Sequence, residues 1–135
     1  MIFKKRPETS ARKFKGAFWF WSNDMTRINR SDGSWFLQVD GDRINDASGR
    51  WLYRLDGDYV CDASGKWQYR IDGDRINYAD GRWMYRFDDP FVCDTSGKWI
   101  YRIDGNRINY ANGKWAYVID GHLPRRMLMA VIAIL

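Results

Sequence analysis

Arginines recur at fixed spacing along this chain and are the side chains best suited to chemistry. In the clearest repeats one arginine precedes a turn dipeptide and a second follows it, as Arg70 and Arg75 flank Asp72-Gly73. Guanidinium groups bind phosphate and carboxylate through paired hydrogen bonds, so a row of them predicts a belt for an anionic partner. Arg27 also belongs to this row. The predicted belt itself consists of Arg43, Arg54, Arg70, Arg75, Arg86, Arg102 and Arg107, with Tyr59 and Phe91 interleaved.

A second interpretation of this belt is internal neutralisation. Residues 19–135 carry 16 basic and 16 acidic side chains, so the region is neutral by count. Like charges placed opposite each other in a sheet are destabilising, and eight arginines therefore need counter-charges. In four units an aspartate follows the first arginine by two residues, and these are Asp56, Asp72, Asp88 and Asp104.

The formal net charge of +5 belongs to a basic tail at residues 1–18. Its basic side chains are Lys4, Lys5, Arg6, Arg12, Lys13 and Lys15. An aromatic run, Phe18–Trp21, follows the tail. Basic residues beside aromatic ones suit an anionic membrane surface, but they equally suit nucleic acid or an acidic protein, and a solvated tail is the alternative.

Groups for catalysis or metal binding are scarce. His122 is the only histidine, and Cys61 and Cys93 are the only cysteines. One histidine and two cysteines cannot supply a four-ligand zinc site. We expect His122 to be a turn residue and the cysteines to be small, partly buried residues. The sequence therefore predicts no catalytic residue, no metal and no cofactor, and it favours a non-enzymatic protein.

A sixteen-residue repeat must position these side chains. Tryptophan recurs every sixteen residues, at Trp19, Trp35, Trp51, Trp67, Trp83, Trp99 and Trp115. Each unit has two turn signals, the first Asp-Gly and the second Ser-Gly, Asp-Gly or Asn-Gly, between short runs rich in Trp, Tyr, Ile and Val. Such dipeptides are typical of hairpin turns. The pattern predicts a mainly β fold, an up-and-down antiparallel meander of about 12 or 13 short strands over residues 19–121.

The register of the strands follows if both turns are two-residue loops. Tyr69 then faces Ile76, and Ile76 faces Tyr85 across the next turn. Both turns preserve the alternation, so Trp, Tyr and Ile share one face and the belt residues are successive cross-strand neighbours on the other. The predicted core aromatics are Trp35, Trp51, Trp67, Trp83, Trp99 and Trp115.

The C-terminal segment at residues 122–135 offers a cover for this apolar face. Pro124 suits the first turn of a helix, and Met127 to Leu135 are all apolar. A helix that is apolar on every side belongs in an interior. We therefore expect a closed barrel around a hydrophobic C-terminal helix, with Val131 to Leu135 as a last buried strand as the alternative.

This arrangement resembles the tubby-like fold of tubby domains, phospholipid scramblases and LURP-one-related proteins. The resemblance lies in the repeated hairpins of residues 35–121 and in the terminal segment RRMLMAVIAIL. It implies phosphoinositide binding or lipid scrambling, although the regular repeat departs from that family. The segment SGKWIYRIDGNRI is similar to choline-binding cell-wall repeats, and the hairpins also resemble the four-fold β-flower family.

The hypothesis that follows is a binding or scaffold protein with an anionic partner, in which lipid head groups are favoured. A cytoplasmic protein, peripheral to a membrane if lipid is the partner, is expected because there are two cysteines and no signal-peptide pattern. The alternatives are a carbohydrate- or cell-wall-binding aromatic repeat protein and a homo-oligomer that assembles through an incompletely closed sheet. No specific nucleic-acid site is recognised.

Overall fold

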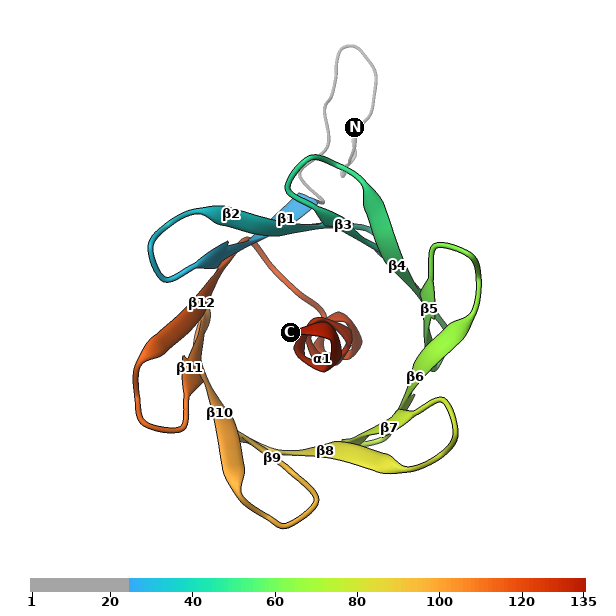
Figure 1. The fold of residues 1–135 in the computed structure, drawn as a ribbon. Helices are drawn as coiled ribbons and strands as arrows, with labels where there is room; N and C mark the ends of the chain where they lie inside the picture. Colours follow the sequence, from blue (N-terminus) through green and yellow to red (C-terminus); the bar gives the residue numbers. More distant parts are fainter. Residues whose placement is uncertain (1–24) are drawn as a thin grey trace, which may run out of the picture.

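The sixteen-residue repeat folds into β-hairpins that join side by side into a ring around a helix (Figure 1). The computed structural model describes residues 25–135. The basic tail at 1–18 and the first tryptophan of the repeat, Trp19, lie outside the described residues.

The described chain forms twelve antiparallel strands in sequence order, and β1 pairs with β12 to close the barrel. The strands and the helix are β1 Met25–Arg30, β2 Trp35–Asp40, β3 Arg43–Asp46, β4 Trp51–Asp56, β5 Tyr59–Asp62, β6 Trp67–Asp72, β7 Arg75–Tyr78, β8 Trp83–Asp88, β9 Phe91–Cys93, β10 Trp99–Asp104, β11 Arg107–Tyr110, β12 Trp115–Asp120 and α1 Arg125–Ile134. The meander, its closure and the C-terminal helix predicted from the sequence are confirmed, and the alternative of a last buried strand is wrong.

One kind of turn is a tight loop of two residues, and it sits one position later than expected. In the hairpin of β6 and β7 the loop is Gly73-Asp74, and Asp72 faces Arg75. Gly73 has φ of 59°, the left-handed conformation that such loops demand. Tyr69 consequently faces Tyr78 rather than Ile76. Because the pairing moves by two residues, the inward and outward faces of both strands are unchanged.

The other kind of turn is longer and is followed by a β-bulge. Three residues separate Tyr78 from Arg82, and the Tyr78 N–H donates to the Arg82 carbonyl at 2.8 Å. Ile76 faces Tyr85 as predicted, but the next pair is Asn77 with Trp83, so one residue of β8 has no counterpart. The extra residues at the six bulges are Phe36, Leu52, Gln68, Met84, Ile100 and Ala116. An extra residue interrupts the alternation of a strand. The residues before the bulge therefore point to the opposite face from the one that strict alternation would give them.

The tryptophans therefore lie on the outer face, and their prediction as core residues is wrong. Their exposed fractions run from 36% to 52%, which no core side chain shows. The corrected residues are Trp35, Trp51, Trp67, Trp83, Trp99 and Trp115. Tyrosines two positions later, such as Tyr85, keep the inward face, and bulge residues such as Met84 join them against the core.

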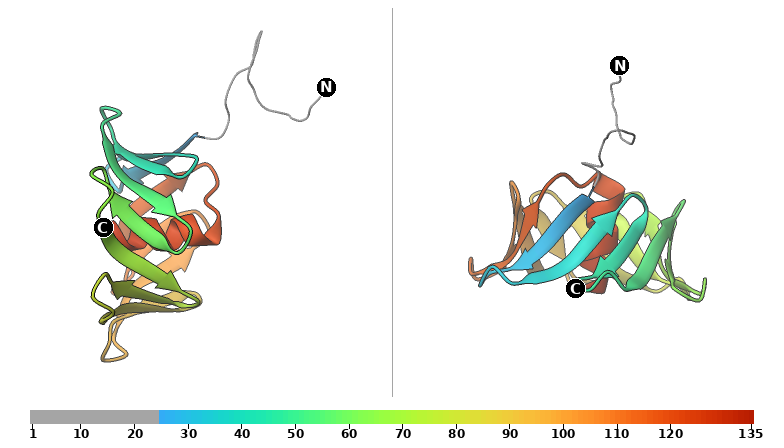
Figure 2. Two further views of the ribbon diagram at one scale, coloured as in Figure 1. Left: turned by 90° about the vertical axis from the view of Figure 1, so that its right-hand side faces the viewer. Right: turned by 90° about the horizontal axis from the view of Figure 1, so that it is seen from above.

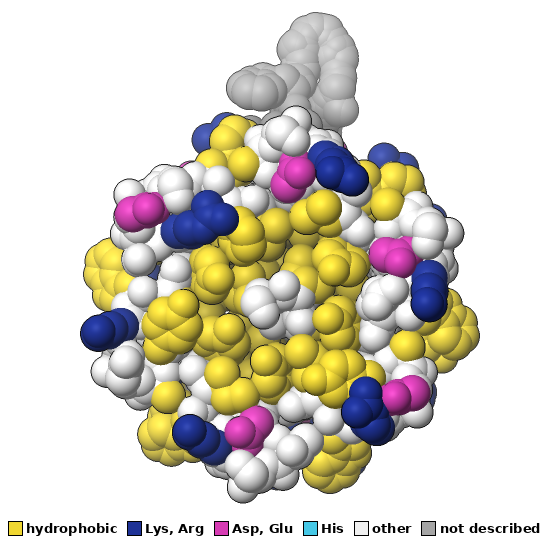
Figure 3. Space-filling view, viewed as in Figure 1, with side chains coloured by type: hydrophobic (Ala, Val, Ile, Leu, Met, Phe, Trp, Pro, Cys, Tyr) yellow, Lys and Arg dark blue, Asp and Glu magenta, His cyan; other side chains and the backbone are white. Residues whose placement is uncertain are grey.

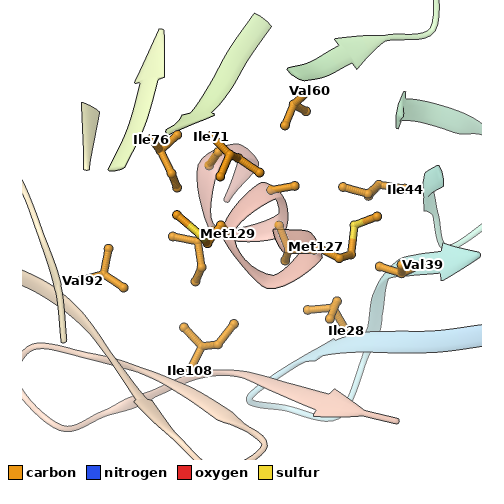
Figure 4. Packing of buried hydrophobic residues seen from close by; sticks show 14 of the residues in the cluster. Ile28, Val39, Ile44, Val60, Ile71, Ile76, Val92, Ile108, Met127 and Met129 are labelled. Carbon is orange, nitrogen blue, oxygen red and sulfur yellow. The ribbon is translucent and has the colours of Figure 1, made fainter. Parts of the chain in front are cut away.

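The core lies between the inner face of the barrel and α1. Met129, Val131 and Ile132 of the helix are almost fully buried. They are encircled by residues of alternate strands, which Figure 4 shows pointing at the helix: Ile28, Ile44, Val60, Ile76, Val92 and Ile108, all 0% exposed. An eight-stranded barrel is filled by its own side chains, whereas twelve strands leave room for a helix about 10 Å wide.

The helix axis runs along the barrel axis (Figure 2). The two ends of the barrel differ in the length of their turns and in the helix terminus that lies there. We call the end with the two-residue loops, such as Gly57-Asp58, the tight-turn end. The opposite end, with the longer loops such as 63–66, is the wide-turn end. Pro124 is the N-cap of α1, and Arg125 contacts tight-turn aspartates, so the helix begins at the tight-turn end. It ends at the wide-turn end, where Ile134 lines a groove with loop residues.

Candidate functional site

Each outer tryptophan is stacked against the residue eight positions earlier in the chain. The six stacks are Arg27 on Trp35, Arg43 on Trp51, Tyr59 on Trp67, Arg75 on Trp83, Phe91 on Trp99 and Arg107 on Trp115. The guanidinium carbons lie 3.6–4.5 Å from the ring centroids, and the aromatic pairs lie 3.7–3.8 Å apart. The bulge creates these stacks because it turns each tryptophan to the arginine-bearing face. We call the six stacks the outer belt.

The structure brings the predicted belt residues together in pairs rather than in one continuous row. Across the wide-turn interfaces Arg43 faces Arg54 and Arg75 faces Arg86, as predicted. Tyr59 faces Arg70 and Phe91 faces Arg102 in the same way. Within a hairpin, however, the first arginine faces a small residue. Examples are Arg54 opposite Cys61 and Arg70 opposite Asn77, so the predicted contacts across the tight turns are wrong.

More arginines of the predicted row stack on a tryptophan ring than form an ion pair with an aspartate. Of the four predicted pairs between an arginine and the aspartate two residues later, residues 25–135 contain only Arg86–Asp88, at 3.9 Å. Arg54 instead contacts Asp42, with Nε 3.4 Å from Oδ2. A guanidinium over an exposed aromatic ring gains about 0.5–1 kcal/mol, and its edge can still donate hydrogen bonds. The belt is therefore both a structural clamp for the tryptophans and a surface with arginine donors.

Two slots occur beside the outer tryptophans, and Cys61 lines one of them. One slot of about 230 Å3 lies between Trp51 and Trp67, with Arg54 and Cys61 among its lining residues. A second, of similar volume, is lined by Trp83 and Arg86 in the unit that contains Cys93. Both thiols are buried, and burial raises the pKa of Cys61, which keeps that thiol protonated and weakly nucleophilic at neutral pH.

Two of the four asparagines at the positions equivalent to Cys61 are buried, and Asn29 and Asn45 are half-buried. Asn77 and Asn109 are each 8% exposed. Among the described residues their side-chain oxygens find no hydrogen-bond donor, and neither does that of Asn45. Cysteine in this position removes such an orphaned polar atom and, being smaller, leaves room for the slot beside it.

The wide-turn end has a broad ring of apolar side chains around its centre, and Figure 3 shows charged side chains around this ring. Its most regular members are the tyrosines two positions after each outer tryptophan: Tyr53, Tyr69, Tyr85, Tyr101 and Tyr117. All but Tyr101 are half-buried, and desolvation in this cluster raises the pKa of Tyr101 to about 12. The bulge residues Leu52, Met84 and Ile100 widen the apolar area. We call this surface the end face.

Charged side chains form a rim around the end face. The basic residues, one before each of five tryptophans, are exposed: Arg50, Lys66, Arg82, Lys98 and Lys114. The acidic residues of the same loops are held by their own turns. Asp62 Oδ1 accepts hydrogen bonds from Ser64 N, Ser64 Oγ and Lys66 N at 2.6–3.0 Å. The Ser64 hydroxyl is the largest cause of the lowered pKa of Asp62. These aspartates stay ionised, yet much of their hydrogen-bonding capacity is used.

The tight-turn end is fastened by the first two residues of the helix. Arg125 Nη1 lies 2.9 Å from Asp89 Oδ2, and Nη2 lies 3.6 Å from Asp74 Oδ1. Arg126 donates to Asp58 and to the Gly57 carbonyl. We call these ion pairs the helix latch. The sequence contained both arginines, but their partners are 36 and 68 residues away in the chain and cannot be inferred from local spacing.

The remaining candidates lie apart from these surfaces. His122 is exposed, and its backbone carbonyl accepts a hydrogen bond from Thr26 Oγ1 at 2.7 Å. Within residues 25–135 no three His, Cys, Asp or Glu side chains are grouped in a way that could hold a metal ion. The one helix in this part of the chain has ten residues, and no helix there has the length and apolar character of a membrane span.

These features define a closed twelve-stranded antiparallel barrel around an axial helix, with an aromatic–arginine belt outside and an apolar face at one end. No family model, no curated protein and no solved structure matches the chain. The arginines of the outer belt were indicated by the sequence, but their stacks on tryptophan were not. The end face was missed, although the recurring triplet of a basic residue, Trp and, two positions later, Tyr was its signal.

Proposed function

We propose that this protein is a non-enzymatic binding protein that docks on an anionic lipid surface through its end face. The observation that carries the proposal is the position of the tyrosines and bulge residues at the wide-turn end, inside a rim of lysines and arginines. Contiguous apolar patches with polar rims mark interaction sites on proteins. Tyrosine suits the membrane interface because its ring is apolar and its hydroxyl is polar.

Shape favours the end face over the outer belt as the membrane contact. The belt runs around a closed barrel, so a flat bilayer can meet only part of it at one time. The end face presents its apolar side chains and rim charges to one side of the molecule together (Figure 3). The arginine belt thereby becomes a secondary candidate for anion binding, with clamping of the tryptophans as its structural role.

Charge favours an anionic bilayer over a neutral one. Each lysine or arginine near an anionic membrane contributes about 1 kcal/mol, and this attraction weakens with salt. The rim aspartates oppose it, but Asp46, Asp62 and Asp94 each accept hydrogen bonds from a serine of their own loop. The basic tail at residues 1–18 adds to the attraction in this proposal, and a cytoplasmic membrane surface is its proposed location.

Co-sedimentation with vesicles tests the proposal through a pair of charge-matched variants. K66E/K98E reverses two rim cations, whereas R70E/R102E reverses two exposed arginines on the outer wall. Both variants retain the basic tail at residues 1–18, so the contribution of the tail to vesicle binding is the same in both. On phosphatidylserine-containing vesicles at low salt, we expect K66E/K98E to lower binding at least about tenfold, since each cation contributes about 1 kcal/mol, and R70E/R102E to lower it much less. Equal losses in the two variants, or no binding by the unmodified protein, would sink the proposal.

Carbohydrate binding is the second candidate function, and the slot beside Cys61 favours it. Trp51 and Trp67 flank one slot, and Arg54 and Asp56 supply polar groups at its wall. Sugar rings pack on indole faces through their C–H groups, while their hydroxyls bond to charged side chains. Quenching or shifting of the tryptophan fluorescence by a panel of monosaccharides would support this candidate.

The closed barrel bears on two other expectations, the family resemblance and self-assembly. Membership of the tubby-like family stays part of the proposal, supported by the closed barrel and its C-terminal helix. Self-assembly through an open sheet loses its basis, because β1 pairs with β12 and no strand of the described chain has a free edge.

A further inference from the structure

The end face is interrupted by a groove at one place on its circumference. The groove has a volume of about 580 Å3, within the range of about 300–1,000 Å3 that is usual for ligand pockets. Its apolar wall comes from the first two described hairpins and from the end of the helix. The residues that form this wall are Trp35, Phe36, Leu37, Leu52, Tyr53 and Ile134.

The groove exists because the repeat is broken at Leu37. The other five first strands of the barrel carry tyrosine at this position, two residues after the tryptophan. Leu37 is 2% exposed and lies at the floor, so the space that a phenol ring would take is open above it. Phe36, which also lines the groove, stacks on Tyr117 with centroids 5.6 Å apart. This apolar recess of the end face therefore coincides with a change in the repeat.

We infer that this groove receives one acyl chain of an anionic phospholipid. The wall is aliphatic and aromatic, which suits a hydrocarbon chain. At its rim the guanidinium of Arg30 lies 4.3 Å from the centroid of Phe36, so a cation stands directly beside the apolar entrance. A chain in the groove places its phosphate at this arginine. The inference rests on the proposed function, because the end face must reach the lipid for the chain to enter.

The polar lining permits an anionic head group at this place. Arg30 Nη1 contacts Ser34 Oγ at 3.4 Å, a long contact that leaves most of its five N–H groups for other acceptors. Asp46 also lines the groove, but its Oδ1 already accepts hydrogen bonds from Ser48 N, Ser48 Oγ and Arg50 N at 2.6–2.9 Å. Asp32, whose pKa the Arg30 charge helps to lower, likewise accepts a hydrogen bond from Ser34 N at 2.8 Å. Both carboxylates are thus engaged with their own turns, and Arg30 is the group suited to a phosphate.

Alkyl phosphates below their micelle concentration test the groove without a membrane. Titration of the intact chain with octyl, decyl and dodecyl phosphate, followed by the calorimetric heat, should give saturable binding to one site. The affinity should rise about fourfold for each added methylene that the groove covers, which corresponds to about 0.8 kcal/mol per buried CH2. Dodecyl trimethylammonium should bind at least about tenfold more weakly than dodecyl phosphate, because Arg30 repels it.

Two variants locate the site, and R82Q is their matched control. L37Y restores the tyrosine of the other units and should lower dodecyl phosphate affinity at least about tenfold. R30Q, a change at an exposed side chain, should lower it about three- to tenfold even if L37Y does not fold. R82Q removes a rim cation outside the groove, so it should leave the affinity for dodecyl phosphate unchanged, although as a rim cation Arg82 contributes to vesicle binding. Unchanged affinity in both L37Y and R30Q, or no dependence on chain length, would overturn the inference.

Vesicle binding separates this inference from the proposed function. If the groove inference is wrong but the proposed function is right, L37Y binds phosphatidylserine vesicles as well as the unmodified protein does, and dodecyl phosphate does not bind. If the proposed function is wrong, the unmodified protein fails to bind vesicles whatever the alkyl phosphates do. Saturable dodecyl phosphate binding that L37Y abolishes, together with weakened vesicle binding by L37Y, supports both.

Discussion

The two ends of the barrel are built from the same repeat, yet they differ in chemistry. At the tight-turn end, Arg125 and Arg126 of the helix pair with aspartates of the two-residue loops, so charge meets charge. At the wide-turn end the helix finishes among tyrosines and bulge residues, and charged loops form only the rim. One end is fastened from within, and the other presents an apolar surface to the surroundings.

Turn length and helix direction explain the difference. A two-residue loop leaves no extra residue, so the strands near the tight-turn end alternate strictly and turn single apolar residues such as Ile71 and Phe87 inward, with the aspartates of the loops beyond them. Each wide turn is followed by a bulge that directs two consecutive residues inward, as with Met84 and Tyr85. The basic residues of α1 are both at its start, so the helix supplies charge to one end and apolar side chains to the other. The asymmetry thus arises from local features of each unit together with one long-range feature, the helix.

The largest expected effect concerns the helix core that separates the two ends. Ile132 is 0% exposed at the centre of the cluster, whereas Ile134 is half-buried at the wide-turn end. I132A should lower the free energy of unfolding by about 2–5 kcal/mol, the usual cost of a large-to-small change in a core. I134A should cost less than half as much. Urea denaturation followed by circular dichroism measures both, and equal costs would contradict the axial position of the helix.

The second prediction concerns the tyrosines of the end face and alkaline pH. Burial raises the pKa of Tyr101 to about 12, above the ordinary value of 10.0. Because the folded state holds the proton more tightly, its stability is complete below pH 10 and is lost as the pH rises from 10 to 12. Y101F removes this part of the alkaline loss, whereas Y110F, at an exposed ring, keeps it. Thermal melts between pH 9 and 12 compare the two variants. Identical profiles would contradict the burial of Tyr101 away from water.

Much of this architecture was predictable because the repeat is regular. The Asp-Gly and Ser-Gly signals identify the hairpins, and the apolar run after Pro124 identifies the helix. The position of the tryptophans was not predicted, because the second turn is one residue longer than assumed and a bulge follows it. A signal for the bulge was present: under strict alternation Leu52, Met84 and Ile100 would face solvent, and their apolar character indicates that they do not.

The surfaces of the molecule were predictable only in part. Arginine pairs such as Arg75 and Arg86 follow from the spacing of the repeat, and the structure brings them opposite each other. The stacks on tryptophan depend on the bulge and were missed with it. The end face and the helix latch depend on how the ring closes and on which way the helix runs through it, and local sequence does not encode either.

The third prediction tests the helix latch at the tight-turn end. R125A removes contacts to Asp74 and Asp89, but these side chains are half-exposed. Exposed ion pairs contribute about 0–1 kcal/mol, so the variant should lose no more than this and should still fold. The loss should shrink in high salt because the attraction is screened. Urea titrations at two salt concentrations measure it, and a cost comparable with that of I132A would show that the latch, rather than the core, holds the helix.

The smallest effect is expected in the rim loops and at acid pH. The pKa of Asp62 is lowered from 3.8, chiefly by the hydrogen bond from the Ser64 hydroxyl. A carboxyl whose pKa is lowered in the folded state stabilises that state above the unfolded pKa, and this stability is lost as the pH falls through the folded pKa. D62N should therefore weaken the dependence of the melting temperature on pH below about pH 4. D56N, at a carboxyl outside such a loop, is the control and should leave that dependence closer to the original.

The central claim is that the end face, and not the tight-turn end, meets the membrane. An environment-sensitive fluorophore can be attached at Ala63→Cys in a wide turn or at Asn106→Cys in a tight turn, both exposed positions, while the buried Cys61 and Cys93 react slowly. With phosphatidylserine-containing vesicles we predict a blue shift and increased emission from the label at residue 63 and little change at residue 106. The reverse pattern, or equal changes at both positions, would contradict the account.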